Sequence, residues 1–334
     1  MADLSETVTR PIPVFILFGP TASGKTEVLT RLFTEGGDFA GSAELVSADS
    51  MQVYRGMDIG TATPGPEERA RLPHHLINIR DPGEQFTAGD FVRLADDACR
   101  TIARRGKLPV ISGGTGFYLK NFVLGLPEAP PSDPAIRAAL RDELAFRGAA
   151  ALMEELRAGD PVSAGRIHLN DAYRLLRALE VFRLSGRPLS AYPGSGVPAG
   201  DSGAAPGPRP EYRFLITGLE RPREELYRRI NERCAAMFRA GLPAEVEALW
   251  KRGYTPKDPG LRAIGYREFF LEDEPGVFRL SGDLARMEAR IAQNSRRYAK
   301  RQMTYFASLP GLRRAAPEDI GGLRAALTEF LRSG

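Results

Sequence analysis

The sequence predicts an α/β protein: a parallel sheet core flanked by helices, carrying a phosphate-binding loop and interrupted by an all-helical insertion. Three observations predict this fold. Residues 19–26 read GPTASGKT, which matches the G-x-x-x-x-G-K-[ST] pattern of a phosphate-binding loop. Strand and helix patterns alternate as far as Ser112, as is typical of a parallel sheet. From about residue 126 the apolar residues recur at spacings of three and four, which indicates helices.

The phosphate-binding loop follows an apolar run from Val14 to Phe18 and precedes a helical pattern, which predicts a P-loop NTPase-like core. Glycines let the backbone approach a phosphate closely, and the helix that follows presents free N–H groups to an anion. Lys25 adds a positive charge, and the Thr26 hydroxyl is placed to bind Mg²⁺. The candidate phosphate-binding residues are Gly19, Pro20, Thr21, Ala22, Ser23, Gly24, Lys25 and Thr26. The motif leaves the ligand open between ATP, GTP and another diphosphate.

The next elements extend the predicted sheet. Ala43 to Ala48 reads as a buried strand that ends at Asp49, and Thr87 with Asp90 predicts a capping box for a helix reaching Arg105. Leu108 to Ser112 is the third strand. It runs into glycines rather than the aspartate that holds magnesium in many ATPases of this loop class. Plain ATPase activity is therefore disfavoured.

The chain divides into four predicted segments. Residues 1–125 form the first part of the α/β core, and residues 126–192 form the helical insertion, with helices over 133–147, 149–158 and 171–185. Residues 193–210 contain ten Pro or Gly in eighteen positions, which predicts a mobile linker. Residues 211–334 return to the core with a strand at 211–218, followed by helices to the end.

Composition narrows the class of protein. At 334 residues the chain exceeds the usual size of one compact core. A net charge of +4 and a pI near 9.1 permit a polyanionic partner without requiring one. The N-terminus lacks the pattern of a secretory signal, and no apolar run is long enough to span a membrane, so we expect a cytoplasmic protein. Cys99 and Cys234 are expected to be buried and reduced, and the three histidines show no zinc-binding spacing.

Two charged residues are candidates for chemistry. Asp49 lies at the strand end beside the phosphate loop, where a carboxylate can act as a general base; a magnesium ligand and a helix cap are the alternatives. Arg233 falls within the apolar face of a helix predicted over residues 223–240. A guanidinium in that position needs an anionic partner. That partner is either an internal carboxylate, which is the commoner case, or the phosphates of a ligand.

A long helix predicted over residues 283–308 carries a positive ridge. Its arginines Arg286, Arg290, Arg297 and Arg301 fall within about 60° on a helical wheel. Such a ridge is usually a solvated face, but aromatic residues nearby make a nucleic-acid backbone the more specific alternative. Arg174 and Arg177 on the insertion would extend such a surface.

These pieces together resemble the tRNA dimethylallyltransferases, also called isopentenyl-adenosine tRNA transferases. The resemblance covers nearly the whole chain, and its specificity lies in motifs occurring together in order. They are GPTASGKT at 19–26, DSMQVYRGMDIGT at 49–61, HHLIN at 74–78, GGTGFYLK at 113–120, NDAYRLLRALEV at 170–181, RINER at 229–233, AIGYR at 263–267 and YAKRQMT at 298–304.

The resemblance implies transfer of a dimethylallyl group from its diphosphate to N6 of the adenine just 3′ of a tRNA anticodon, with Mg²⁺ as cofactor. In such a family Asp49 is the base, and Lys25, Thr26 with its magnesium, and Arg233 hold the departing diphosphate. Thr115 sits close to the target adenine. The residues implied in tRNA contact are Asp49, Ser50, Met51, Gln52, Thr115, Arg137, Tyr173, Arg174 and Arg177, to which the ridge adds Arg290 and Arg297. A monomer without a membrane partner is expected.

Two further functions fit parts of the sequence. A small-molecule or nucleoside kinase would share the phosphate loop, Asp49 and the sheet, but it should also show a mobile arginine-bearing lid and a nucleotide-base pocket. A phosphate-loop RNA-binding module without catalysis would not need both Asp49 and a buried Arg233. The sequence therefore favours the prenyltransferase.

Overall fold

The structure, a computed structural model, describes residues 10–34, 36–126, 129–192, 209–306 and 309–333. The chain forms two compact units: a core unit of residues 1–123 with 210–334, and an insertion unit of residues 124–209. The insertion unit thus begins two residues before the predicted insertion. The predicted linker at 193–210 lies almost wholly outside the described residues.

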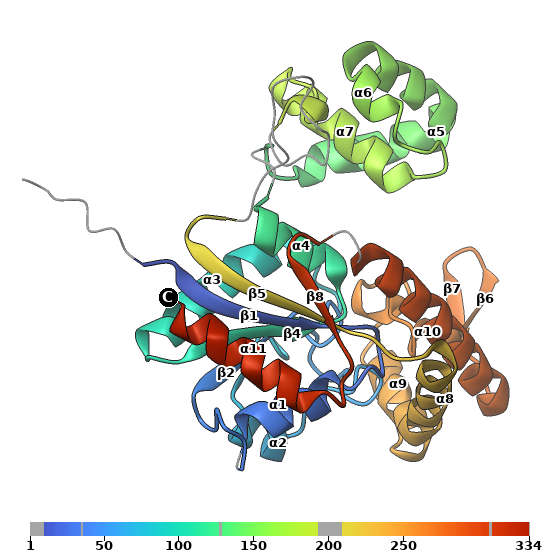
Figure 1. Cartoon of the computed structure of the whole chain (residues 1–334). Coiled ribbons are helices and arrows are strands. Elements are labelled where there is room, and N and C mark those ends of the chain that lie inside the picture. Colours follow the sequence, from blue (N-terminus) through green and yellow to red (C-terminus); the bar gives the residue numbers. More distant parts are fainter. Residues whose placement is uncertain (1–9, 35, 127–128, 193–208, 307–308, 334) are drawn as a thin grey trace, which may run out of the picture. The chain divides into compact units, whose positions relative to one another are not determined.

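The core unit is built on a six-stranded sheet with the strand order β3-β2-β4-β1-β5-β8 (Figure 1). Every pairing in this sheet is parallel. The strands are β1 (Ile12–Phe18), β2 (Ala43–Ser47), β3 (His74–His75), β4 (Leu108–Gly113), β5 (Tyr212–Leu219) and β8 (Leu312–Ala315). The predicted strands at 14–18, 43–48, 108–112 and 211–218 are confirmed to within about two residues. Because β1, β2 and β4 are parallel neighbours, their carboxyl ends and the loops that follow meet at one edge.

Helices cover both faces of this sheet, which explains why its central strands are continuous apolar runs. On one face, Phe15 and Leu17 of β1 pack in one apolar cluster with α1 (Lys25–Phe33) and α11 (Ile320–Arg332). On the other face lie α3 (Ala88–Arg104) and α4 (Gly116–Leu124), where Phe91 stacks on Tyr118 with ring centroids 4.7 Å apart. The predicted capping box of α3 is confirmed: the Thr87 hydroxyl accepts from Asp90 N at 3.1 Å, and the Asp90 carboxylate accepts from Thr87 N at 3.0 Å.

The C-terminal part of the core unit contains strands that the sequence did not predict. After α8 (Arg223–Arg239) and α9 (Leu242–Lys251) comes an antiparallel hairpin, β6 (Phe270–Glu274) and β7 (Val277–Leu280), and after α10 (Leu284–Phe306) comes the edge strand β8. The expectation of helices alone to the end is therefore wrong. Each of these strands has at most five residues, and Figure 1 shows the hairpin beside α10. Strands this short, with exposed and charged residues, give little alternating pattern.

The insertion unit is helical in its described part. It contains α5 (Pro134–Gly159), α6 (Pro161–Ala164) and α7 (Ala172–Ser185), whose apolar faces form a separate small core. The predicted helices at 133–147 and 149–158 run together as α5, with an interruption at Gly148, where φ is +78°. Glycine adopts this left-handed conformation without a steric penalty. The short helix α2 (Pro66–Arg71) belongs to the core unit. Three 3₁₀ helices are also described, at Leu189–Ala191, Gly260–Arg262 and Arg267–Phe269.

Both cysteines are buried and neither forms a disulfide bond, as predicted. Among the described residues, no three His, Cys, Asp or Glu side chains are grouped so that they could hold a metal ion. No helix in the described ranges is both long enough and apolar enough to cross a membrane.

Candidate active site

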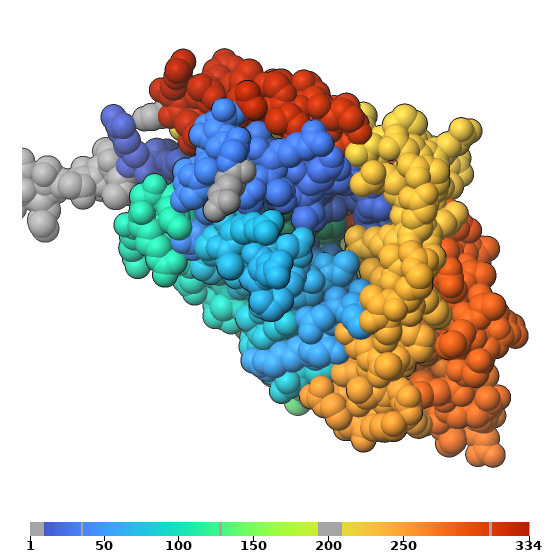
Figure 2. All heavy atoms as spheres, turned by 90° about the horizontal axis from the view of Figure 1, so that it is seen from below, coloured from blue at the N-terminus to red at the C-terminus, as the bar shows by residue number. Residues whose placement is uncertain are grey.

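A cavity of about 1040 Å³ opens in the core unit where the phosphate loop, the ends of β2 and β4, and helices α8 and α10 come together. Figure 2 shows one face of this region, on which the blue N-terminal segments adjoin the gold helix α8. Residues 21–26 of the loop line the cavity, and so do Asp49, Arg233 and Tyr298. The structure therefore brings the predicted phosphate loop, the candidate base and Arg233 into one site.

The phosphate loop has the backbone conformation that its sequence predicts. Ala22 and Gly24 adopt left-handed φ values of +63° and +101°. A Cβ at Gly19 would lie 2.5 Å from the Ser23 hydroxyl oxygen, so any larger residue there would displace the Ser23 side chain. Gly24 precedes the first turn of α1, whose N-terminal N–H groups favour a bound anion. The exposed Thr26 lies in that turn and lines the cavity.

Lys25 folds back over the loop. Its Nζ donates to the carbonyl oxygens of Gly19 and Pro20 at 2.8 and 3.0 Å. Burial lowers the pKa of the Lys25 ammonium to about 8, the positive charge of Arg233 adds to this effect, and the Asp49 carboxylate opposes it. An anion bound beside Lys25 would stabilise the charged form of this ammonium.

The end of β2 places Asp49 beside Thr115. The Asp49 carboxylate accepts a hydrogen bond from Met51 N at 2.9 Å, so it also caps the turn that follows the strand. Thr115 Oγ1 accepts from Ser50 N at 3.0 Å, and Thr115 N donates to Ala48 O at 3.1 Å. Thr115 thus fixes the segment that carries Asp49, although it does not itself line the cavity.

The glycines after β4 permit this close packing. A Cβ at Gly113 would lie 2.2 Å from Ala48 O, and a Cβ at Gly114 would lie 2.4 Å from the side-chain nitrogen of Gln302. The Gly-rich segment is therefore needed where β4 ends against β2 and α10.

Arg233 projects from α8 toward the cavity. Its Nη2 donates to the carbonyl oxygen of Thr61 at 3.3 Å. In the described part of the chain no carboxylate lies within ion-pair distance of Arg233. Burial lowers the pKa of the Arg233 guanidinium, and the charge of Asp49 acts in the opposite direction. Among the described residues, Arg233 therefore has no internal carboxylate partner. Of the two alternatives left by the sequence, this leaves the phosphates of a ligand.

Helix α10 contributes two cavity residues that the sequence analysis did not assign. Gln302 is buried; its Oε1 accepts from Thr21 N at 3.1 Å and its Nε2 donates to Gly114 O at 2.6 Å, so it joins the phosphate loop to the end of β4. Burial and the nearby Asp49 charge raise the pKa of Tyr298 to about 12. Both residues belong to the YAKRQMT motif and are less exposed than Arg290 and Arg297 of the same helix. Helical spacing within that motif was the signal that could have identified them.

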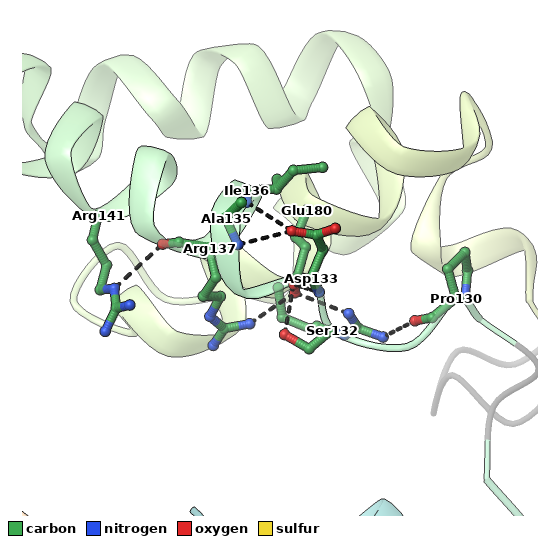
Figure 3. A network of polar contacts seen from close by, with 9 residues as sticks. Pro130, Ser132, Asp133, Ala135, Ile136, Arg137, Arg141 and Glu180 are labelled. Carbon is green, nitrogen blue, oxygen red and sulfur yellow. Dashed lines mark hydrogen bonds and ion pairs between the residues drawn. The ribbon is translucent and has the colours of Figure 1, made fainter.

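Arg137 and Arg177 of the insertion unit are placed differently from Arg233. Arg137 donates at 2.9 Å to the carboxylate of Glu180, which is fully buried (Figure 3). Arg177 donates to the same carboxylate at 2.9 Å. Ser132 Oγ and Asp133 N complete this network at 2.6 and 2.8 Å. Burial alone would raise the pKa of Glu180, but the hydrogen bonds from Ser132, Arg177 and Arg137 outweigh it and hold the pKa below its ordinary value.

Two other insertion residues that the resemblance implied in tRNA contact are exposed. The Arg174 side chain is 72% exposed and Tyr173 is 71% exposed. The guanidinium of Arg137 lies over the Tyr173 ring, 4.6 Å from its centroid. Tyr173 and Arg174 are therefore accessible, whereas Arg137 and Arg177 are largely committed to Glu180.

Fold and cavity define a phosphate-loop α/β protein in which the loop, an arginine and a carboxylate face one cavity, an arrangement that suits a group-transfer enzyme. The model of the IPP transferase family matches residues 52–309. A tRNA dimethylallyltransferase from Geobacter sulfurreducens is 44% identical over 308 residues, which cover 89% of this chain and 90% of that protein. The chain belongs to the IPP transferase family.

Solved structures agree with this assignment. The tRNA isopentenylpyrophosphate transferase of Bacillus halodurans is 33% identical, with a TM-score of 0.63 over 96% of this chain and 97% of that chain. A eukaryotic dimethylallyltransferase, solved acting on tRNA, has a TM-score of 0.77 at 24% identity, covering 96% of this chain and 80% of that chain. The latter similarity supports the fold.

Proposed function

We propose that this chain transfers a dimethylallyl group from dimethylallyl diphosphate to N6 of the adenine just 3′ of the anticodon in tRNA, and releases diphosphate. The observation that carries this proposal is the half-buried Arg233, which faces the same cavity as the phosphate loop and Asp49 and has no ion pair among the described residues. An anion-binding site of this kind suits a diphosphate that must leave.

The diphosphate occupies the phosphate-loop side of the cavity. Backbone N–H groups at the start of α1 and the Arg233 guanidinium meet its charge, and Lys25 exchanges its contacts with Gly19 and Pro20 for phosphate oxygens. Donors that are already in place stabilise the charge that grows on a leaving group.

Magnesium fits this side of the cavity. Oxygen ligands suit Mg²⁺, and the Thr26 hydroxyl lines the cavity at the start of α1 beside the place proposed for the diphosphate. Bound there, the ion would supply Lewis-acid stabilisation of the departing diphosphate. Asp49 lines the same cavity, so it could instead be a magnesium ligand. The Mg²⁺ dependence of an Asp49 variant distinguishes the two roles.

Asp49 acts as the base. N6 of adenine attacks the first carbon of the prenyl chain, the bond from that carbon to the diphosphate oxygen breaks, and the N6 proton passes to the Asp49 carboxylate. An exocyclic amine conjugated to a purine is a weak nucleophile, so a positioned carboxylate helps as charge moves away from nitrogen. The adenine must leave its stack to reach a buried site. Thr115 holds the Asp49 segment in place, and Ser50, Met51 and Gln52 follow it at the cavity.

The anticodon arm of tRNA is the second substrate. Exposed Arg290 and Arg297 on α10 supply phosphate contacts, and the accessible Tyr173 and Arg174 of the insertion supply others. Arg137 and Arg177 serve the contacts of the insertion unit mainly through the structure they stabilise around Glu180. A monomer suffices, since residues of one core unit line the whole cavity.

The test is to incubate the chain with labelled dimethylallyl diphosphate, Mg²⁺ and unmodified tRNA, and then to digest the tRNA and locate the label. We expect the label on the adenine 3′ of the anticodon. Label on another nucleotide would overturn the assigned position. Absence of label, together with phosphate transfer from ATP to a small molecule, would establish the kinase alternative.

A further inference from the structure

The loop from Asp58 to Thr61 is anchored by a residue that neither the motifs nor the proposed mechanism uses. Glu245, in the first turn of α9, accepts hydrogen bonds from the consecutive backbone N–H groups of Asp58, Ile59 and Gly60 at 2.9, 2.8 and 3.1 Å. Three backbone donors converging on one carboxylate are charge-assisted contacts, which are stronger than neutral ones.

The Glu245 carboxylate also accepts a hydrogen bond from a buried side chain. Tyr266, which is fully buried, donates its hydroxyl to Glu245 Oε1 at 2.7 Å. A Cβ at Gly60 would lie 2.5 Å from the Tyr266 ring, so the loop packs directly on this tyrosine. Burial raises the pKa of Tyr266, and the charge of Glu245 raises it further, so the phenol keeps the proton that it donates.

The anchored loop ends at the cavity. Thr61 is buried, and its hydroxyl donates to Met57 O at 2.5 Å, which fixes the loop at its other end. The Thr61 carbonyl oxygen accepts from Arg233 Nη2 at 3.3 Å, the contact that holds this guanidinium within the described residues. Gly60, Thr61 and Arg233 all line the cavity. An unbroken chain of contacts therefore runs from Glu245 through the backbone to Arg233.

We propose that Glu245 is a positioning residue for the diphosphate site: it fixes the Asp58–Thr61 loop so that the Thr61 carbonyl aims Arg233 at the anion. The identity of the anion rests on the proposed function. Without the carboxylate, three N–H groups lose their acceptor and the loop loses its defined conformation. Arg233 then binds the anion less well, although it remains in the chain.

The test measures the affinity of the whole chain for inorganic diphosphate with Mg²⁺, by calorimetry and without tRNA. Glu245→Gln keeps the size of the side chain but places an amide NH₂ among backbone donors, and we expect affinity to fall about tenfold. Tyr266→Phe removes one of the four contacts and should weaken binding about threefold. Glu247→Gln, on the exposed side of the same helix, is the matched control and should leave affinity unchanged.

A double-mutant cycle separates positioning from general stability. In an Arg233→Met background, Glu245→Gln should have no further effect on diphosphate affinity, because its action passes through Arg233. Additive losses, or wild-type affinity in Glu245→Gln, would overturn the proposal. If thermal melting shows that Glu245→Gln does not fold, Tyr266→Phe in the same cycle decides instead. Loss of tRNA labelling by the wild type, with diphosphate binding intact, would refute the proposed function and leave this inference standing.

Discussion

Arg233 in the core unit and Arg177 in the insertion unit are both helical arginines that sequence reasoning associated with phosphate. Their surroundings differ. Arg177 donates to the buried Glu180 at 2.9 Å, and Arg137 donates to the same carboxylate. Arg233 donates to a backbone carbonyl at 3.3 Å and faces a cavity that also contains the phosphate loop. The first arrangement is complete without a ligand, whereas the second leaves a half-buried cation without an anionic partner among the described residues.

The difference shows that a buried arginine indicates a ligand site only when no internal carboxylate lies beside it. Removing one partner from a buried ion pair mainly costs stability, because the other charge is left uncompensated. Removing a cation that awaits an anion should mainly cost affinity.

The largest effect is expected at Asp49. Asp49→Ala should lower turnover by ~10² or more, while tRNA affinity stays near normal, since the base acts on the N6 proton and not on binding. Single-turnover transfer with saturating tRNA measures this. Asp273→Ala, in the exposed ion pair of the β6–β7 hairpin, is the control. A large shift in the Mg²⁺ concentration needed for half-maximal activity of Asp49→Asn would instead identify Asp49 as a magnesium ligand.

The two arginines can be compared directly. Arg233→Met should weaken binding of inorganic diphosphate about thirtyfold, as expected when a charged hydrogen-bonding group worth about 2 kcal/mol is removed. Arg177→Met should leave diphosphate affinity unchanged and lower the free energy of unfolding by about 2 kcal/mol, because Glu180 keeps Arg137 and Ser132 as partners. Calorimetry and chemical denaturation measure the two quantities. Equal losses of diphosphate affinity in Arg233→Met and Arg177→Met would contradict the conclusion that only Arg233 binds the anion.

Lys25 gives a pH test. Its ammonium has a pKa of about 8 in the ligand-free site, and diphosphate needs the charged form. Affinity for diphosphate should therefore decline as pH rises through about 8, by up to tenfold per pH unit. Lys25→Met should bind more weakly at pH 7 and lack this component of the decline. Parallel pH profiles for the two proteins would show that Lys25 does not titrate in the binding reaction.

The smallest effect is expected on the exposed surface of α10. Arg297→Ala should weaken tRNA binding modestly and reduce the slope of log affinity against log salt by about one, as for one lost phosphate contact. Arg290→Ala should behave in the same way. Arg279→Ala, which removes an ion pair from the hairpin, is the control. If the slope of log affinity against log salt is unaltered in both α10 variants, the ridge is a solvated face that does not contact tRNA phosphates.

The sequence predicted the elements whose residues carry periodic or motif signals. The phosphate loop, the strand ending at Asp49 and the cap at Thr87 depend on local residue types, and each is confirmed in the structure. The short strands β6, β7 and β8 were not predicted. The hairpin strands β6 and β7 are short and largely exposed, and β8 pairs with the distant strand β5.

Site residues were likewise missed where their role depends on contacts with distant parts of the chain. Glu245 and Gln302 act through contacts to backbone groups far away in the sequence, from Asp58 N to Glu245 and from Thr21 N to Gln302. No local pattern marks such contacts. Glu180 lies three residues after Arg177 on α7, a spacing that could have suggested their ion pair. Nothing in the sequence shows that Glu180 is buried against Ser132 and Arg137.

The central claim is that the phosphate loop holds a leaving group and not a nucleotide to be hydrolysed. The most direct measurement follows diphosphate release and prenyl incorporation together, in a reaction with dimethylallyl diphosphate, Mg²⁺ and unmodified tRNA but no nucleotide triphosphate. We predict one diphosphate released for each dimethylallyl group found on tRNA, with no change when ATP is added. A requirement for ATP, or consumption of ATP in proportion to product, would contradict the claim.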